Sequence, residues 1–390
     1  MSAAVETFAP VGGPLLTRPV KVLAAIFAAA VAIVLHRFVF GLGSVSALND
    51  GYPWGPWKVL SVIVFSAFAS GGYAVALLVY VLNWKTYHAL ARTAMLTSAL
   101  GYTAAVVTLG IDIGRPWNFW RLLIVTGWNL QSVLLEIAVS ISAYILFLWL
   151  EMAPPFLEAW SHGDVNLLRR LARRATPILD RAMPYIVAMA IVLPSMHQSS
   201  LGSLMLLAGP RLHPYWQTPL LPLLFLLSCW LLGYAFVILT ALLSSLAWGR
   251  RPEMEPLASL ARVTAWVVFV FLAVRAGDLF ARGQLAVVPF TGYSVLLLAE
   301  CGLLLWAGLV MQRADRTMRR GQLFLSACAT LGGGGLYRLD AALIALMPGS
   351  EFSYFPSVGE MVVTLGLTSF AILAYIVIVK RVPILAEETR

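Results

Sequence analysis

Residues 220–246 read LLPLLFLLSCWLLGYAFVILTALLSSL, an uncharged and mainly apolar run. An α-helix rises about 1.5 Å per residue, so about 20 such residues cross the roughly 30 Å hydrocarbon core of a bilayer. Similar runs recur along the chain, which is 60% hydrophobic and only 12% charged. We therefore predict an all-α polytopic membrane protein with about ten transmembrane helices. The expected spans are residues 21–41, 59–83, 90–112, 127–150, 182–208, 216–246, 258–278, 292–312, 321–346 and 359–380.

Basic residues fall mainly on one side of this predicted topology. If the N-terminus is cytoplasmic, 19 of the 27 Lys and Arg residues lie on the cytoplasmic side. Cytoplasmic loops are enriched in these residues, so we expect both termini to be cytoplasmic. The basic segment 151–181 is expected to contact membrane lipid headgroups as an amphipathic segment. Because short loops account for the net charge of +9, no nucleic-acid partner is required.

Two acidic pairs occur in similar local sequence. Asp112 and Glu136 lie in the earlier part of the chain, and Asp278 and Glu300 lie in the later part. An offset of four spans preserves the direction of crossing, so we predict two parallel four-helix bundles plus flanking helices. In apolar sequence, a chance match is the alternative. The predicted regions are a tail at 1–20, a first helix at 21–41, four-helix units at 59–208 and 216–346, and a last helix with its tail at 359–390.

Ionisable residues within the spans gather toward the outer side of the predicted topology. A charged side chain at the centre of a membrane helix costs about 2.5–3.5 kcal/mol on insertion scales, so such residues usually face protein or water. The later half contains a predicted polar cluster of Arg275, Asp278, Glu300, Arg338 and Asp340. The alternatives are a local i,i+3 ion pair between Arg275 and Asp278, and a packing role for Arg338 and Asp340.

Glu136 and His197 are expected at similar depth and have no counter-ion nearby in the sequence. An imidazole titrates near neutral pH, and together with a carboxylate it can exchange protons with a bound redox molecule. Residues 194–203 add a proline and several hydroxyl groups around His197, which favours a polar and accessible helix wall. The alternative is that both side chains are buried with satisfied hydrogen bonds.

The distribution of cysteine and histidine argues against metal cofactors in this chain. Cys229, Cys301 and Cys328 are widely separated in apolar runs, and there is no CxxC motif, so we expect no metal site and no iron–sulfur cluster. Haem with two histidine ligands needs facing histidines at matching depth. Of the five histidines, only His36 and His197 lie within expected spans. We therefore expect no haem, with a single haem between these two residues as the alternative.

A set of short motifs extends over nearly the whole chain. They are RFVFGLGSVSALNDGYPWGPW at 37–57, IDIGRPWN at 111–118, SVLLE at 132–136, LPSMHQSSLGSLM at 193–205, HPYWQ at 213–217 and YFP at 354–356. Together they resemble the NrfD/PsrC family of membrane subunits. More narrowly, they resemble the HybB-type subunits of periplasm-facing [NiFe] hydrogenases.

The resemblance implies a haem-free, quinone-binding subunit in the bacterial inner membrane that is not catalytic alone. Such a subunit exchanges electrons between an iron–sulfur (ferredoxin-like) partner at the outer face and menaquinone or ubiquinone, here most simply for hydrogenase large and small subunits. The same family serves polysulfide or tetrathionate reductase, formate dehydrogenase, quinone reductase and alternative complex III. A secondary transporter is the other class considered, but transporters of that kind often have inverted repeats around a site at the midplane.

Within this family, the polar residues take on specific expected roles. We predict that Glu136, His197 and Asp112 transfer protons. The quinone is expected to be bound by His197, Gln198, Tyr102, Asp112, Arg115 and Glu136. Asp112 and Arg115 forming a structural pair is the alternative at that position. The loop containing Asn49, Trp54 and Trp57 is expected to contact the iron–sulfur partner, with an interfacial aromatic belt as the alternative.

Overall fold

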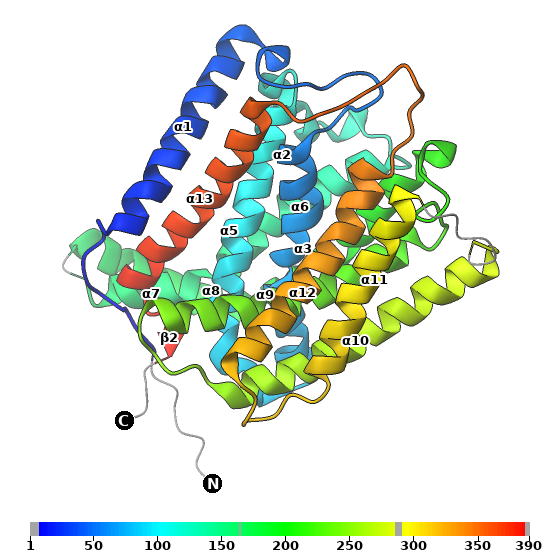
Figure 1. The fold of residues 1–390 in the computed structure, drawn as a ribbon. Helices are drawn as coiled ribbons and strands as arrows, with labels where there is room; N and C mark the ends of the chain where they lie inside the picture. The colour runs from blue at the N-terminus through cyan, green and yellow to red at the C-terminus, as the bar shows by residue number, and fades with distance from the viewer. Residues whose placement is uncertain (1–7, 164, 285–290, 387–390) are drawn as a thin grey trace.

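The computed structural model describes residues 8–163, 165–284 and 291–386. Helices dominate these residues, and the long ones run side by side in one bundle (Figure 1). The long helices are α1 (Arg18–Phe40), α5 (His88–Asp112), α6 (Val133–Glu151), α8 (Asn166–Leu206), α9 (Leu221–Ala247), α10 (Met254–Ala281), α11 (Gly292–Met311), α12 (Arg320–Leu339) and α13 (Val358–Arg381).

Shorter elements connect or extend the long helices. The short α-helices are α2 (Pro56–Lys58), α3 (Ser66–Phe68), α4 (Gly71–Ala76) and α7 (Ala153–Ser161). The π-helices are η2 (Val59–Phe65), η3 (Leu77–Val81) and η8 (Asp340–Ile344). The 3-10 helices are η1 (Leu42–Ser44), η4 (Lys85–Tyr87), η5 (Pro116–Leu123), η6 (Val125–Gly127) and η7 (Gly209–Arg211). The strands are β1 (Phe8–Ala9) and β2 (Leu385–Ala386).

The all-α, polytopic membrane fold is confirmed. Among the described residues, nine helical segments are long and apolar enough to cross a membrane. They are Arg18–Phe40, Pro56–Val81, Lys85–Asp112, Val133–Ser161, Asn166–Leu206, Leu221–Ala247, Met254–Ala281, Gly292–Met311 and Val358–Arg381. The other expected span, 321–346, forms α12 and η8, which carry Arg320, Arg338 and Asp340. Its glycines and charges make it less apolar than the nine, and it packs against α9 and α11.

The boundary expected between the basic segment 151–181 and the fifth span is wrong. Residues 166–206 form the single helix α8, which has Pro177, Pro184 and Pro194 in its interior. A proline removes one backbone hydrogen bond but does not end a helix when packing neighbours hold both sides. Here α6 and α9 pack along α8, so the helix continues through Pro194.

Helix α9 lies near the centre of the bundle and packs against α4, α8, α10 and α12. Gly71 and Gly233 allow α4 and α9 to approach closely, because a Cβ added to Gly233 would lie 2.9 Å from the Gly71 nitrogen. At one edge, α1 packs along α13, as their neighbouring blue and red ribbons show in Figure 1. The division into four-helix units at 59–208 and 216–346 stays a prediction.

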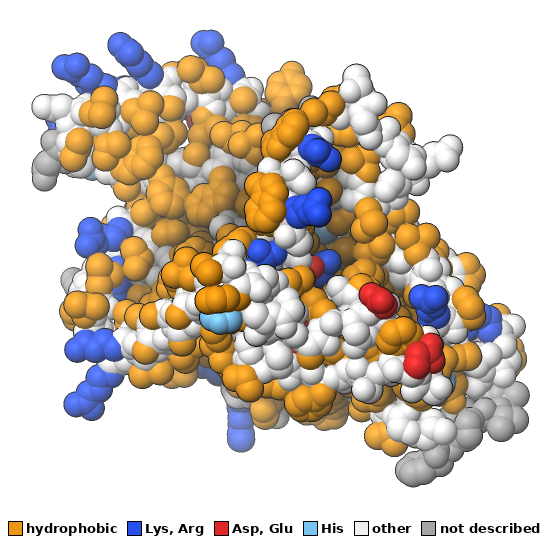
Figure 2. Space-filling view, turned by 90° about the horizontal axis from the view of Figure 1, so that it is seen from above, with side chains coloured by type: hydrophobic (Ala, Val, Ile, Leu, Met, Phe, Trp, Pro, Cys, Tyr) orange, Lys and Arg blue, Asp and Glu red, His pale blue; other side chains and the backbone are white. Residues whose placement is uncertain are grey.

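Both ends of the described chain lie at one end of the bundle. β1 pairs antiparallel with β2, and Arg92 at the start of α5 donates to the carbonyl of Pro383 nearby. We call this the termini end and the opposite end the far end. Figure 2 views the molecule from above the far end and shows hydrophobic side chains over much of the surface and its rim. Which end faces the cytoplasm stays a prediction.

Candidate functional site

Five buried polar residues from four helices meet in what we call the central cluster: Ser66, Tyr102, His197, Gln198 and Arg338. All five are completely buried. The amide of Gln198 connects three of the others, because its Oε1 accepts from Arg338 at 2.8 Å and its Nε2 donates to the Tyr102 hydroxyl at 3.0 Å and to Ser66 at 3.1 Å. The predicted quinone ligands Tyr102 and Gln198 are therefore neighbours.

Arg338 belongs to this central cluster and not to the polar cluster expected in the later half of the chain. Its guanidinium also donates to the Ser228 hydroxyl at 2.9 Å, to the Ile63 carbonyl at 2.7 Å and to the Phe225 carbonyl. All of these partners are neutral oxygens. Ile63 lies in the π-helix η2, and Arg338 is close to the start of the π-helix η8. π-Helical turns often occur at functional sites, and these two border the central cluster.

His197 lies on α8 within the central cluster, with its ring 5.9 Å from the Tyr102 ring, centroid to centroid. Neither ring nitrogen makes a hydrogen bond to a described residue. Buried polar atoms are almost always paired with protein or water. An unpaired, fully buried imidazole is therefore available to a ligand or an ordered water, and its predicted role in proton transfer remains a prediction.

Glu136 lies in the first turn of α6 and is exposed in the isolated chain. Its Oε1 accepts a 2.6 Å hydrogen bond from the hydroxyl of Ser200, which lies one turn after His197 on α8. The alternative that Glu136 is buried with satisfied hydrogen bonds is therefore wrong, because α6 begins at the far end and its first turn opens to the surface. The positive end of the helix dipole favours a carboxylate at this position. The structure thus places Glu136 close to the His197 turn, with Ser200 between the two.

Asp112 is held by a lysine and a tryptophan. Lys58 lies 2.6 Å from its Oδ2, and the indole Nε1 of Trp57 donates to its Oδ1 at 3.0 Å. The alternative pair between Asp112 and Arg115 is wrong, because Arg115 is exposed in the turn after α5. Trp57 is completely buried, so we also correct the expectation that its ring contacts a partner.

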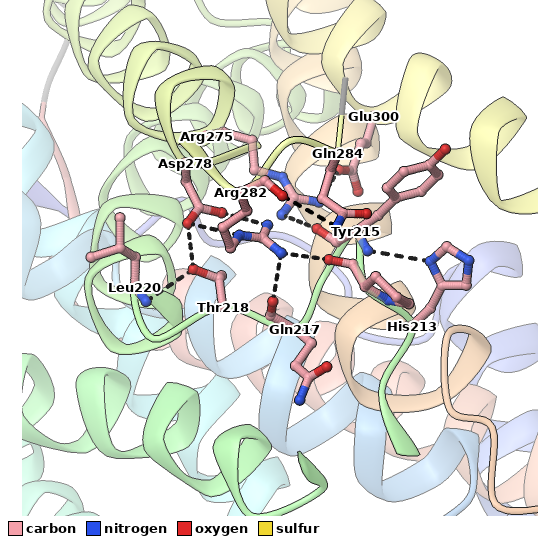
Figure 3. Close-up of polar contacts among 11 residues, drawn as sticks. His213, Tyr215, Gln217, Thr218, Leu220, Arg275, Asp278, Arg282, Gln284 and Glu300 are labelled. Carbon is pink, nitrogen blue, oxygen red and sulfur yellow. Dashed lines mark hydrogen bonds and ion pairs between the residues drawn. The ribbon is translucent and has the colours of Figure 1, made fainter. Parts of the chain in front are cut away.

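A second polar network lies at the far end between α10, α11 and the segment that joins α8 to α9 (Figure 3). Arg275 pairs with Glu300 at 3.0 Å, and both side chains are 1% exposed. Asp278 pairs instead with Arg282 at 2.6 Å, one helical turn later. The local pair between Arg275 and Asp278 is therefore wrong, because Arg275 pairs with Glu300 on α11 and Asp278 pairs with Arg282.

The same network fixes the joining segment 207–220. Arg282 donates to the carbonyls of Pro214 at 2.6 Å and Gln217 at 2.8 Å, and Arg275 donates to the carbonyl of Tyr215 at 2.7 Å. Thr218 adds a hydrogen bond to Asp278 at 2.6 Å, which Figure 3 also shows. Charged side chains of α10 and of Arg282, directly after it, thus hold the backbone that leads from α8 into α9.

His213 is a further part of this segment. It packs its ring 4.2 Å from the Tyr293 ring, and its Nδ1 accepts from the backbone nitrogen of Tyr215. Partial burial lowers the pKa of His213 from its ordinary value. A lowered pKa favours the neutral imidazole, and the hydrogen bond from Tyr215 needs an unprotonated Nδ1.

Asp340, the last member of the expected polar cluster, is separate from these pairs. It is completely buried at the start of η8, and neither carboxylate oxygen makes a hydrogen bond to a described residue. The five residues expected to form one cluster therefore do not lie together. Arg275 pairs with Glu300, whereas Asp278 pairs with Arg282. Arg338 belongs to the central cluster, and the Asp340 carboxylate has no hydrogen-bond partner among the described residues.

The loop after α1 is fastened to the chain's other far-end loops. Asn49 donates to the carbonyl of Ser353 at 3.0 Å, and the indole of Trp54 donates to the carbonyl of Ala342 at 2.8 Å. Sequence reasoning missed Glu360, which is completely buried and accepts from the Tyr354 hydroxyl at 2.8 Å. The signal was present, because Ser357 and Glu360 form the S-x-x-E capping box that begins α13. Contact of Asn49 and Trp54 with a partner stays a prediction.

Sequence reasoning also missed two buried groups on α6. Tyr144 is completely buried and Glu151 is 4% exposed. The Tyr144 hydroxyl and Glu151 Oε1 make no hydrogen bond to a described residue. Their spacing from Glu136 along one helix face was the signal in the sequence.

Known proteins similar to this chain include membrane components of redox enzymes. An Escherichia coli (strain K12) protein named "Probable Ni/Fe-hydrogenase 2 b-type cytochrome subunit" is 37% identical over 96% of this chain and 94% of its own length. The "Menaquinone reductase, integral membrane subunit" of Nitratidesulfovibrio vulgaris is 27% identical over 62% of this chain and 57% of its own length. Another protein of the same Nitratidesulfovibrio vulgaris strain is 27% identical over 91% of this chain and 91% of its own length.

The name of the E. coli relative contradicts our expectation that this chain carries no haem, because "b-type cytochrome" denotes a haem protein. Haem iron commonly takes a histidine as axial ligand. His197 suits that role because it is buried and both ring nitrogens are unpaired, whereas His36 is exposed and lies 3.3 Å from the Ser44 hydroxyl. A haem bound through His197 would supply one-electron transfer.

A family model extends the comparison over most of the chain. The model described as "Polysulphide reductase, NrfD" matches residues 44–340. This region contains the central cluster, the network around Arg275 and the exposed Glu136. With the extent of the match to the E. coli protein, it shows that the chain belongs to the NrfD family of membrane subunits of oxidoreductase complexes.

Proposed function

We propose that this chain is the quinone-reactive membrane subunit of a hydrogen:quinone oxidoreductase. In this role it exchanges electrons between a ferredoxin-like iron–sulfur subunit at the far end and menaquinone or ubiquinone in the bilayer. The name of the E. coli relative supports a hydrogenase complex, and we propose its large and small subunits as partners. The name of the menaquinone reductase subunit supports menaquinone as the quinone. The chain itself is not catalytic without these partners.

The observation that carries the proposal is an exposed acid beside a buried polar wall. Glu136 is exposed at the far end of α6, and its carboxylate is held by Ser200 on α8. One turn along α8 lie His197 and Gln198, which belong to the central cluster. A quinone carbonyl gains basicity as electrons arrive and then needs a proton. The surface acid Glu136, with the polar side chains of His197 and Gln198 deeper in the bundle, suits a quinone headgroup that enters from the lipid between α6 and α8.

The acid–base role of Glu136 is tested by Glu136→Gln, which keeps the shape and removes the titratable group. Quinone reduction by the purified complex should fall by roughly 10²-fold or more, the usual scale for a positioned acid or base. Hydrogen oxidation with a soluble artificial acceptor should stay normal, because that reaction bypasses the membrane subunit. Glu158→Gln is the matched control, since Glu158 is an exposed acid at the opposite end of the bundle. Full quinone activity in both Glu136→Gln and His197→Ala would refute the assignment.

We further propose that the termini end faces the cytoplasm and the far end faces the periplasm. The unequal distribution of basic residues supports this orientation. Single cysteines introduced in 166–181 and 313–319 should react with a membrane-impermeant reagent only after the cells are opened. Labelling of these segments in intact cells would show the reverse orientation.

A further inference from the structure

A row of polar residues follows one face of α6 from the far end toward the termini end. Glu136, Ser140, Tyr144 and Glu151 are separated by four, four and seven residues, which returns each side chain to nearly the same face of a helix. We call these residues the α6 row. Ser140 and Tyr144 are completely buried, and Glu151 is 4% exposed, so the row passes through the interior of the bundle.

Glu151 lies at the termini end of this row. The next helix, α7, carries Glu158, which pairs at 3.2 Å with Arg92, and Arg92 in turn contacts the carbonyl of Pro383 beside β2. Glu158 is exposed to solvent and has a cation, whereas no ion pair links Glu151 to a described Lys, Arg or His. Tyr80 and Tyr144 interact electrostatically with Glu151.

Several buried polar atoms on the α6 row and beside it have unused hydrogen-bonding capacity. The Tyr144 hydroxyl, Glu151 Oε1 and both ring nitrogens of His197 make no hydrogen bond to a described residue. Buried polar atoms are rarely left unpaired, and ordered water usually supplies the missing partner. Such a series of unpaired atoms therefore fits a chain of water molecules between the side chains.

The row reaches the proposed quinone site in two ways. Along α6 itself, the Ser140 hydroxyl donates at 2.6 Å to the backbone carbonyl of Glu136. Sideways, the Tyr144 ring lies 4.6 Å from the Tyr102 ring, centroid to centroid and nearly perpendicular to it. Tyr102 in turn accepts from Gln198 and packs beside His197. Glu151 lies two helical turns beyond Tyr144 on the same face of α6, so water between these two side chains would complete a path from the termini end to Glu136 and to the central cluster.

We infer that the α6 row conducts protons from the termini end to the quinone site, with Glu151 as the group that takes up each proton from water. This inference rests on the proposed function. Quinone takes two electrons from the reduced iron–sulfur partner and two protons from the row, which yields quinol. Each proton released by Glu151 is replaced from the aqueous phase at the termini end. Tyr144 passes protons without net change, because a hydroxyl accepts one proton while it donates another.

The consequence is a defined side for proton uptake. Hydrogen oxidation by a partner at the far end releases protons there, whereas quinone reduction would consume protons from the termini end. Electron transfer to quinone would then move charge across the membrane without a separate pump. The competing arrangement is proton uptake from the far end through Glu136 alone. Proton uptake from the termini end makes the compartment at that end more alkaline, whereas uptake through Glu136 takes its protons from the compartment at the far end.

The test uses the intact complex in proteoliposomes with the termini end inside, hydrogen as the electron donor, a membrane quinone and an enclosed pH-sensitive dye. Wild-type complex should make the interior alkaline in proportion to the quinol formed. Glu151→Gln should slow this internal uptake by at least about 10-fold, toward the roughly 10²-fold loss typical of a positioned acid or base. Glu151→Asp, which keeps the acid, should restore part of the rate, and Tyr144→Phe should also slow uptake.

Glu158→Gln is the matched control, because it removes an acid from the same end of the bundle without touching the row. Activity with a soluble acceptor verifies that each variant complex is assembled. Quinol formation without internal alkalinisation in the wild type, or unchanged uptake in Glu151→Gln, overturns the inference while the proposed function stands. Absence of quinone reduction by the wild-type complex overturns the proposed function itself and the inference with it.

Discussion

Replacing Arg275 by methionine should destabilise the protein far more than replacing Arg275 and Glu300 together by apolar residues. Both side chains are 1% exposed, and their ion pair is 3.0 Å long. Arg275 also holds the Tyr215 carbonyl at 2.7 Å, and Glu300 accepts from the Trp216 indole at 3.2 Å. The single change therefore leaves a buried carboxylate with one neutral donor and a backbone carbonyl without its partner.

The magnitude follows from the cost of an uncompensated buried charge. Removing one member of a buried ion pair typically costs about 3–5 kcal/mol, which corresponds to a change of roughly 10²- to 10⁴-fold in the unfolding equilibrium. Replacing both members by well-packed apolar residues is often neutral or stabilising, so Arg275→Met with Glu300→Leu should recover most of the loss. The lost Tyr215 contact should keep recovery incomplete by about 1–3 kcal/mol, the cost of an unsatisfied buried carbonyl.

The assay is equilibrium unfolding of the purified chain in mixed detergent micelles, for wild type, both single variants and the double variant. The exposed pair between Arg316 and Glu255 is the matched control, because its side chains are 74% and 58% exposed at a separation of 2.6 Å. The same four-way comparison there should give a coupling of only about 0–1 kcal/mol. Equal and additive losses at the buried and exposed pairs would refute the reasoning.

Two further predictions concern the segment 207–220 and the contact between α8 and α9. Since the folded pKa of His213 is lowered, its stabilising contribution is complete above its unfolded pKa of about 6.5 and is lost as pH falls through the folded pKa. Trp216 fluorescence should therefore report loosening on acidification that is absent in His213→Gln; identical pH profiles for both proteins would count against it. Gly202→Ala places a Cβ 2.5 Å from the Leu221 carbonyl oxygen, so it should cost about 1–3 kcal/mol by overpacking. Gly110→Ala, which meets nothing within 4 Å, should be tolerated in the same unfolding assay, and equal losses for the two alanines would exclude overpacking as the cause.

The fold was largely predictable because hydrophobic runs of membrane length leave few alternatives. The differences between the predicted spans and the observed helices have local physical causes. The fifth span merges with the basic segment before it into α8, because packing on both sides carries the helix through its prolines. The segment around Arg338 was counted with the other spans by its length, although its charges and glycines fit a helix enclosed by its neighbours better than one facing lipid.

Ion pairing was the least predictable feature of the site. Sequence spacing alone favoured Arg275 with Asp278, yet the partner of Arg275 is Glu300 on the next helix. The spacing of residues in the sequence does not determine the angles at which helices pack, so it does not show which neighbouring helix each face contacts. For the same reason, the alternative pair of Asp112 with Arg115 overlooked Lys58, which is the cation that contacts Asp112. The exposure of Glu136 was missed because its depth was counted from the expected end of a span.

The ionisable residues fall into two classes, those with a counter-ion inside the protein and those without one, and we expect mutations in the two classes to have different effects. Arg275 has the counter-ion Glu300 and donates to the Tyr215 carbonyl. Asp278 has the counter-ion Arg282 and accepts from the Thr218 hydroxyl, so Arg275 and Asp278 together hold the segment 207–220 in place. His197 and Glu151 have buried polar atoms with no partner among the described residues. An unpaired polar group in a membrane protein is costly, so it is retained where a ligand, a water or a moving proton completes it. By this reasoning, loss of a paired residue should reduce stability, whereas loss of His197 or Glu151 should reduce turnover and leave the fold intact.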